Sequence, residues 1–344
     1  MAVTLADVAA RAHVSAATVS RVLSGNYPVA EETRARVMRA VDELDYVVNG
    51  PASALAAATS DLVGVLVNDV ADAFFGIMAS AVQTELGASK LAVVCNTGGS
   101  PERELTYLTL LLRQRAAAVI ITGSAVEGEE HMSAVAARIR RLAANGTRVV
   151  LCGRPASAAP EGTAVALEFD NRGGGQALTE HLIALGHRRI GYVAGPAERT
   201  TTRHRLDGHR AALAAHGLDA NAERLTVHGL YDRGSGHAAA LELLRREPDL
   251  TAIVASNDTV ALGVCAALRE KGLRIPDDVS VAGFDDLPFS ADMQPALTTV
   301  RLPLQEAAGR AARLALGRER APEGGVDVVP FELQVRGSTG APRG

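Results

Sequence analysis

Nine short apolar runs after residue 60, separated by segments long enough for helices, constrain the fold of this 344-residue chain more than any other feature. Each run is almost continuously apolar, which is typical of parallel strands covered by helices on both faces. Nine strands exceed one comfortable sheet, so the pattern predicts an α/β core of two doubly wound parallel-sheet subdomains. The runs cover residues 62–69, 91–97, 117–123, 147–153, 165–170, 189–195, 225–229, 251–258 and 278–285.

Polar residues follow several of these runs at the carboxyl ends of the predicted strands. Doubly wound folds bind their ligands at this edge of the sheet. We therefore expect these side chains to line a cleft. They are Asn68 and Asp69, Asn96, Asp170 and Asn171, Asn257 and Asp258, and Asp285 and Asp286.

Two other stretches also follow predicted strands. Phe74 and Phe75 are adjacent aromatics in a chain that is only 3% aromatic, and they could be core residues or an apolar wall against a ring-shaped ligand. Residues 195–208 carry three arginines, among them Arg199 and Arg205. These could lie solvated at the surface or offer a bidentate fork to a polar ligand. The residues alone leave both alternatives open.

The sequence predicts neither an enzyme nor a cofactor or metal site. It has no G-x-S-x-G and no H-E-x-x-H motif, and its three cysteines lie far apart. The stretch DNRGGG at residues 170–175 fits neither G-x-G-x-x-G nor the Walker pattern. There is no run of eighteen apolar residues and no leader-like start. We therefore expect a soluble, cytoplasmic protein with reduced cysteines and no membrane contact.

A compact helical unit is predicted in front of this core. Thr4 and Asp7 can form a weak capping box, and apolar residues recur at helical spacing over residues 5–12 and 19–23, with Ser15 as a second cap. A third helix over residues 31–44 would close a small core. The unit is either a helix-turn-helix or a plain helical hairpin. The exposed residues of its second helix would be Ala16, Ala17, Thr18, Ser20 and Arg21.

The charge of this unit counts mildly against DNA binding. Residues 1–60 contain five Arg, no Lys and six Asp or Glu, and the whole chain has a net charge of −4. Phosphate contacts supply most non-specific affinity for DNA. Such a head would depend on a few Arg, on hydroxyls and on backbone N–H groups at helix N-termini.

Five stretches, in order and with matching spacing, resemble the lactose-repressor/galactose-repressor family of bacterial transcriptional regulators. They are residues 4–25, 29–46, 170–195, 255–263 and 275–304, and the similarity runs from Thr4 to about Thr339. The resemblance implies a helix-turn-helix head at 1–48, a hinge helix at 49–60 and a periplasmic-binding-protein-like core at 61–344. The first subdomain of that core would be about 61–169 plus 301–324, and the second about 170–300 plus 325–344.

The resemblance also implies DNA contacts. Arg21 is the best candidate for a hydrogen bond to a base, with guanine as its preferred partner, and Ala16 and Ala17 would offer small apolar contacts. Leu55 matches the hinge leucine that enters the minor groove at the operator centre, where an apolar wedge kinks the duplex. Ser53 stands where most members carry a basic residue. The positions that match phosphate contacts are Thr4, Ser15, Thr18, Ser20, Thr33 and Tyr46.

For an effector, the resemblance points to Phe74 and Phe75 on the first subdomain and to Asp170 at the border. On the second subdomain it points to Arg199, Thr201, Arg205, Tyr231, Asn257 and Asp285. Aromatic stacking combined with Arg, Asn and Asp groups suits a sugar, and a purine or another small polar metabolite would suit the same set.

The resemblance thus implies a dimeric, ligand-responsive regulator, namely a repressor that binds a palindromic operator and is switched by a small polar effector in the cleft. The alternative is a cytoplasmic binding module whose head has lost specific DNA binding. The non-basic head and Ser53 support that alternative.

Overall fold

The computed structural model describes residues 3–24, 28–46 and 60–343, which fall into two compact units, Met1–Asp61 and Leu62–Gly344. Residues 49–59 of the predicted hinge, with Leu55 and Ser53, lie outside the described residues. Among the described residues, no helix is long and apolar enough to cross a membrane.

The described part of the first unit contains three helices, and they begin and end close to where the sequence predicts. These are α1 (Leu5–Ala12), α2 (Ala16–Ser24) and α3 (Glu31–Glu43). The capping box at α1 is present, because the Asp7 N–H donates to Thr4 Oγ1 and the Thr4 N–H donates to Asp7 Oδ2. Ser15 Oγ accepts a hydrogen bond from the Thr18 N–H at 3.1 Å at the start of α2. The three helices bury a small core of Val8, Ala9, Ala12, Val19, Val22, Val37 and Ala40.

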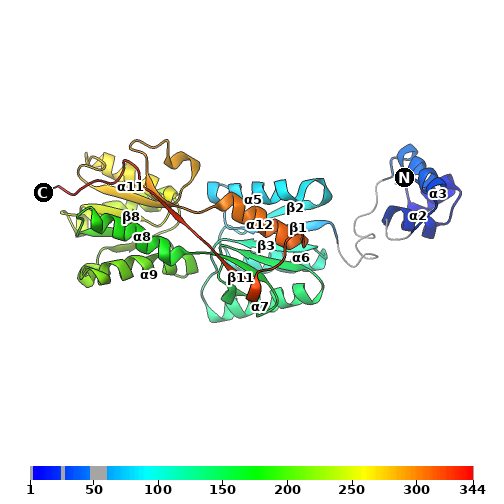
Figure 1. The fold of residues 1–344 in the computed structure, drawn as a ribbon, viewed down its shortest axis with the longest axis horizontal. Helices are drawn as coiled ribbons and strands as arrows, with labels where there is room; N and C mark the ends of the chain where they lie inside the picture. Colours follow the sequence, from blue (N-terminus) through cyan, green and yellow to red (C-terminus); the bar gives the residue numbers. More distant parts are fainter. Residues whose placement is uncertain (1–2, 25–27, 47–59, 344) are drawn as a thin grey trace. The chain divides into compact units, whose positions relative to one another are not determined.

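The first subdomain of the second unit is built on a six-stranded sheet in the order β11-β5-β4-β3-β1-β2, with all pairs parallel. The strands are β1 (Leu62–Val67), β2 (Leu91–Asn96), β3 (Ala118–Thr122), β4 (Arg148–Cys152), β5 (Val165–Phe169) and β11 (Val326–Val329). Helices α5 and α12 cover one face, where they pack side by side, and α6 and α7 cover the other (Figure 1). Their bounds are α5 (Ala73–Leu86), α6 (Pro101–Arg113), α7 (Glu129–Ala144) and α12 (Leu304–Leu316).

The second subdomain repeats this architecture with a sheet in the order β12-β10-β9-β8-β6-β7. The strands are β6 (Ile190–Ala194), β7 (Thr226–His228), β8 (Ala252–Ala255), β9 (Ser280–Asp285), β10 (Thr298–Arg301) and β12 (Glu332–Gln334), the last antiparallel to β10. Helices α8 (Asn171–Ala184) and α9 (Thr200–Ala215) pack together, as do α10 (Arg233–Arg246) and α11 (Asp258–Glu270). Short 3₁₀ turns are η1 (Gly87–Ser89), η2 (Ala156–Ala158), η3 (Asp219–Asn221), η4 (Pro288–Ser290) and η5 (Glu323–Gly325).

The prediction of a helical head followed by two parallel-sheet subdomains is confirmed, and each of the nine predicted runs contains a strand. Three further strands, β10 to β12, were missed because they are only three or four residues long and contain polar residues. The assignment of residues 325–344 to the second subdomain is wrong for β11. Val326–Val329 pairs with β5 of the first sheet, and the chain reaches the second sheet only at β12.

His209 makes the stability of the core depend on pH. The side chain of His209 is 1% exposed, its Nδ1 lies 2.9 Å from Thr179 Oγ1, and burial lowers its pKa to about 3. An unfolded chain protonates histidine near pH 6.5. Acid therefore favours the unfolded state between these two values, and lowering the pH from 7 to 5 should remove about 2 kcal/mol of stability through this residue. Urea unfolding at both pH values should show a smaller loss for His209→Gln than for the wild type. Equal losses would contradict the assignment.

Candidate functional site

A cavity of about 450 Å³ lies between the two subdomains of the core, where the carboxyl ends of strands from both sheets meet the starts of the following helices. Eight of the nine residues that the family resemblance assigned to the effector line it: Phe74, Phe75, Arg199, Thr201, Arg205, Tyr231, Asn257 and Asp285. The wall also includes residues that the prediction missed, among them Asp72, Ser124, Glu198, Leu230, Asp232 and Thr259. Each of these lies close after a predicted strand, which is the signal that could have found them.

Asp170 does not line the cavity. It caps α8, and its Oδ1 accepts a hydrogen bond from the Gly173 N–H at 2.8 Å. Four other polar residues expected at the cleft also lie elsewhere: Asn96, Asn171, Asp258 and Asp286. Asp258, for example, accepts hydrogen bonds from Ser290, Thr299 and the Leu287 N–H inside the second subdomain. Some side chains that follow a strand face the cleft, and others face the interior of the subdomain. Position in the sequence alone does not tell which side chains face the cleft.

Arg205, on α9, is the centre of a buried polar network at the cavity wall. It is 3% exposed, and its guanidinium stacks on the ring of Phe284 at 3.7 Å. Its Nε donates to Asn171 Oδ1 and its Nη2 to Asp285 Oδ1, both at 2.8 Å, while Nη1 donates to the Ser256 carbonyl. The sequence left open whether this guanidinium lies in solvent or binds a ligand, and in the structure its N–H groups are used within the protein. It holds the Asp285 carboxyl group at the wall, where the carboxyl oxygens can accept hydrogen bonds from hydroxyl groups.

Asp285 is held in an unusual electrostatic and backbone environment. Burial raises the pKa of its carboxyl to about 7, and the Asp258 and Asp72 carboxylates add to this, against the opposing charge of Arg205. Burial, with Asp69 nearby, also raises the pKa of Asp72. The backbone φ of Asp285 is +105°, which is rare for a residue other than glycine. Perturbed carboxyls and strained backbone gather at functional sites, and both occur here at one residue.

Aromatic side chains from both subdomains contribute the apolar part of the wall. Phe74 and Phe75 pack edge to face with ring centroids 4.9 Å apart, at the start of α5. Phe75 lies so close to Gly123 that a Cβ there would be 2.9 Å from its ring, and the φ of Gly123 is +74°. From the second subdomain, the Tyr231 hydroxyl lies 2.6 Å from Thr202 Oγ1. The site therefore combines aromatic faces with carboxylate, amide and hydroxyl groups, a lining suited to a small polyhydroxylated molecule.

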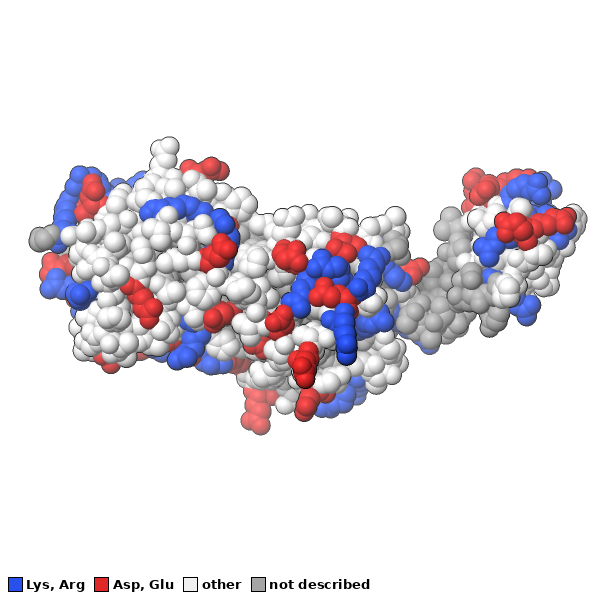
Figure 2. All heavy atoms as spheres, viewed as in Figure 1, with Lys and Arg blue, Asp and Glu red and all other residues white. Residues whose placement is uncertain are grey.

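The head presents the predicted DNA-facing residues on its surface. Ala16, Ala17, Ser20 and Arg21 are exposed along α2, while Val19 and Val22 of the same helix are buried. Of the predicted phosphate contacts, Thr4 and Ser15 are exposed, and Thr18, Thr33 and Tyr46 are half-buried. Figure 2 shows acidic and basic side chains mixed on the visible face of this unit, in agreement with its lack of net positive charge.

No group of three or more His, Cys, Asp or Glu side chains in the described part of the chain is arranged to hold a metal ion. The three cysteines are free and buried.

Comparisons with known proteins agree with the architecture. Residues 4–49 match the family described as bacterial regulatory proteins, lacI family, and residues 179–339 match the periplasmic binding protein-like domain. The HTH-type transcriptional regulator GalR of Escherichia coli (strain K12) is 36% identical over 91% of this chain and 88% of its own.

Two solved structures resemble nearly the whole chain. A complex of the transcriptional regulator CelR with cellobiose is 32% identical, with a TM-score of 0.69 over 98% of this chain and 99% of that one. The lac repressor dimer bound to operator and the anti-inducer ONPF is 28% identical, with a TM-score of 0.76 over 99% and 100% of the two chains. These relatives are regulators rather than enzymes. The chain therefore belongs to the lacI family of bacterial regulatory proteins, which are DNA-binding transcriptional regulators.

Proposed function

We propose that this protein is a repressor that binds a palindromic operator as a homodimer and is switched by a small polar effector, a sugar, held in the cavity of its core. The observation that carries the proposal is the lining of that cavity, where Asp285, fixed by Arg205, lies with Asn257 and the aromatic rings of Phe74, Phe75 and Tyr231. Vicinal hydroxyls pair well with carboxylate and amide groups, and the apolar face of a sugar ring stacks on aromatic side chains.

One structural relative supports the proposed sugar effector, and the other supports the proposed dimer on operator DNA. The CelR structure holds cellobiose, and the lac repressor structure is a dimer bound to operator. An effector changes operator affinity only through its different affinities for the two conformations of the regulator. A cavity shared by two subdomains supplies such a difference, because the orientation of the subdomains determines how many groups reach the ligand.

Exposed apolar side chains on β2 and α6 of the first subdomain support dimerisation. Leu91 and Val94 lie on β2, the edge strand of its sheet, and are 63% and 41% exposed. Leu110 lies on α6, the helix that follows β2 in the chain, and is 43% exposed. Edge strands of monomers are usually protected by charges, prolines or bulges rather than by apolar side chains. We propose that a second copy of the chain covers the β2 edge of the sheet.

A sugar panel tests the effector half. The panel holds neutral mono- and disaccharides, cellobiose among them, together with nucleobases, and the readout is the thermal unfolding of the wild-type protein. A ligand that binds only the folded state raises the unfolding temperature, and the increase grows with the logarithm of its concentration above Kd, so we expect a concentration-dependent increase with at least one sugar. A response to nucleobases alone would replace the sugar by a purine-type effector. No response to any member would favour a cavity that binds neither class.

Arg21→Ala tests the assignment of the base contact in the head. Arg21 is exposed on α2 and is the only arginine or lysine of that helix. A hydrogen-bonded pair between arginine and guanine contributes about 1–3 kcal/mol of discrimination. We expect operator affinity to fall about tenfold or more, with relaxed preference at one symmetric pair of base positions. Fluorescence anisotropy against the operator and its substituted versions measures both, and Arg36→Ala on α3 is the matched control. An equal loss on every sequence would instead make Arg21 a phosphate contact.

A further inference from the structure

A short segment of the first subdomain, residues 123–127, forms part of the cavity wall and also meets the second subdomain. We call it the seam segment. Gly123 and Ser124 line the cavity. Two other residues of the segment contact the start of α9. The Ala125 N–H donates to Thr200 Oγ1 at 3.0 Å, and the Thr200 N–H donates to the Ala125 carbonyl at 3.1 Å. The Glu127 N–H donates to the Glu198 carbonyl at 2.7 Å, and Arg203 Nε donates to Glu127 Oε1 at 2.8 Å. The seam segment therefore connects the wall of the cavity to the start of α9, so its conformation affects both.

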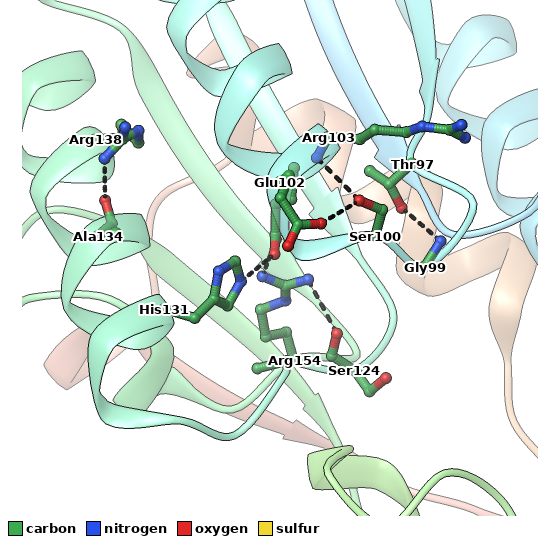
Figure 3. Close-up of polar contacts among 12 residues, drawn as sticks. Thr97, Gly99, Ser100, Glu102, Arg103, Ser124, His131, Ala134, Arg138 and Arg154 are labelled. Carbon is green, nitrogen blue, oxygen red and sulfur yellow. Dashed lines mark hydrogen bonds and ion pairs between the residues drawn. The ribbon is translucent and has the colours of Figure 1, made fainter.

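The buried guanidinium of Arg154 donates a hydrogen bond to the seam segment (Figure 3). Arg154 follows β4 and is 3% exposed, and its Nη2 donates to the Ser124 carbonyl at 3.0 Å. Its Nη1 pairs with Glu104 Oε1 of α6, and the other carboxylate oxygen of Glu104 lies 3.0 Å from His131 Nε2 of α7. Arg154 alone thus donates to the Ser124 carbonyl at the cavity wall, and groups from α6 and α7 hold Arg154 in a chain of contacts behind it.

The same pair is connected to a second loop of the cavity. Glu104 lies in the first turns of α6, directly after the loop that contains Gly98 and Gly99, and both glycines line the cavity. The Gly99 carbonyl accepts a hydrogen bond from Arg199 Nη2 of the second subdomain, and Val126 of the seam segment forms an isolated bridge with Arg199. The Arg154–Glu104 ion pair therefore connects the two loops, at Gly99 and at Val126, that both contact Arg199.

Stability alone does not account for a buried ion pair at this place. Two charges lose their hydration on burial, and apolar side chains of similar volume are often as stable or more stable. Burial acts to raise the pKa of Glu104, but the charge of Arg154 and hydrogen bonds from His131 and Arg154 lower it to about 2, so the carboxylate stays ionised. What an apolar replacement could not do is donate a hydrogen bond to the Ser124 carbonyl.

We propose that Arg154, held in place by Glu104, is a positioning residue for effector binding that fixes the seam segment as a preformed cavity wall and seat for α9. The inference rests on the proposed function, since it concerns the site in which the effector would bind. Its main readout needs no effector, because the hydrogen bonds of the seam segment can be followed in the free protein.

The test is amide hydrogen exchange in the full-length double variant Glu104→Leu/Arg154→Met. The variant removes both charges together, so no unpaired charge is left buried, and its unfolding temperature should stay close to that of the wild type. The amides of Ala125 and Glu127 should nevertheless exchange about tenfold faster, because local opening of the seam segment becomes easier. Amides of β3 and β4 should keep their wild-type protection.

Two further variants keep the test decisive. Arg138→Met is the matched control, because Arg138 of α7 donates to the Ala134 carbonyl in its own helix and not to the seam segment (Figure 3). Its seam amides should exchange at the wild-type rate. Arg154→Lys is the variant to use if the double variant fails to fold. It keeps a charge opposite Glu104 but cannot reproduce the planar fork that reaches both Glu104 and the Ser124 carbonyl, so its seam amides should also exchange faster than in the wild type.

Wild-type protection of Ala125 and Glu127 in the folded double variant, or in Arg154→Lys, would overturn the inference and leave the pair a packing feature. For the sugar that gives the largest thermal shift with the wild-type protein, the double variant should bind about tenfold more weakly by calorimetry. If no sugar binds the wild type, the proposed function fails, but the exchange result still decides whether Arg154 positions the seam segment.

Discussion

Replacing Arg205 by alanine is expected to abolish the effector response while the head keeps its affinity for operator DNA. The substitution removes three hydrogen bonds at once and leaves the Asp285 carboxylate buried at the cavity wall without its cation. Breaking a buried ion pair by removing one partner typically costs about 3–5 kcal/mol of stability. The loss of an oriented carboxylate should weaken effector binding by about 100-fold or more.

The measurement combines calorimetry with the effector and fluorescence anisotropy with operator DNA, at a temperature where the core of the variant is still folded. Arg210→Ala is the matched control on the same helix, because Arg210 makes an exposed ion pair with Glu223 and such pairs contribute about 0–1 kcal/mol. Asp285→Asn separates charge from shape, since it keeps an acceptor for Arg205. An unchanged effector affinity in Arg205→Ala would refute the assigned site.

Replacing Gly208 by alanine is expected to destabilise the second subdomain, although alanine is normally the better helix former. Gly208 lies where α9 meets α8, and a Cβ there would be 2.0 Å from the Arg172 carbonyl oxygen. Main chain cannot move aside as a flexible side chain can, so the two helices must separate. Overpacking of this kind costs about 1–3 kcal/mol or more, which exceeds the gain in helix propensity of about 1 kcal/mol.

Gly76→Ala is the control for this effect. Gly76 lies in the interior of α5, and a Cβ there would meet nothing within 4 Å. That substitution should be neutral or stabilise the protein by up to about 1 kcal/mol. Urea unfolding of both variants measures the difference, and similar stabilities would show that α8 and α9 are not packed through Gly208.

Local signals in the sequence predicted most of the fold. The Thr4–Asp7 capping box, Ser15 at the start of α2 and the nine apolar runs are all properties of neighbouring residues, and the structure shows each of them. The strands β10 to β12 depend on partners far along the chain. Residues 326–329, for example, form a strand only because β5 offers an edge for pairing.

Some residues of the candidate site could likewise be predicted from the sequence, and others could not. Phe74, Arg205 and Asp285 were found because they follow strands or match the family pattern, whereas Asp170 follows a strand and only caps α8. Arg154 and Glu104 gave no signal. Glu104 lies in a helix with charged neighbours, and it is buried only because Arg154, fifty residues away, pairs with it.

The central claim is that the head reads a symmetric DNA site under the control of the core. The most direct test is selection of bound duplexes from a random DNA library by the purified protein, sequenced after several rounds and repeated in the presence of the sugar that stabilises the core. The account predicts a palindrome of two half-sites about one helical turn apart, with a flexible central step, and a change in its recovery when the sugar is present. Recovery of no motif by the folded protein would contradict the account and favour a ligand-binding module whose head no longer recognises DNA.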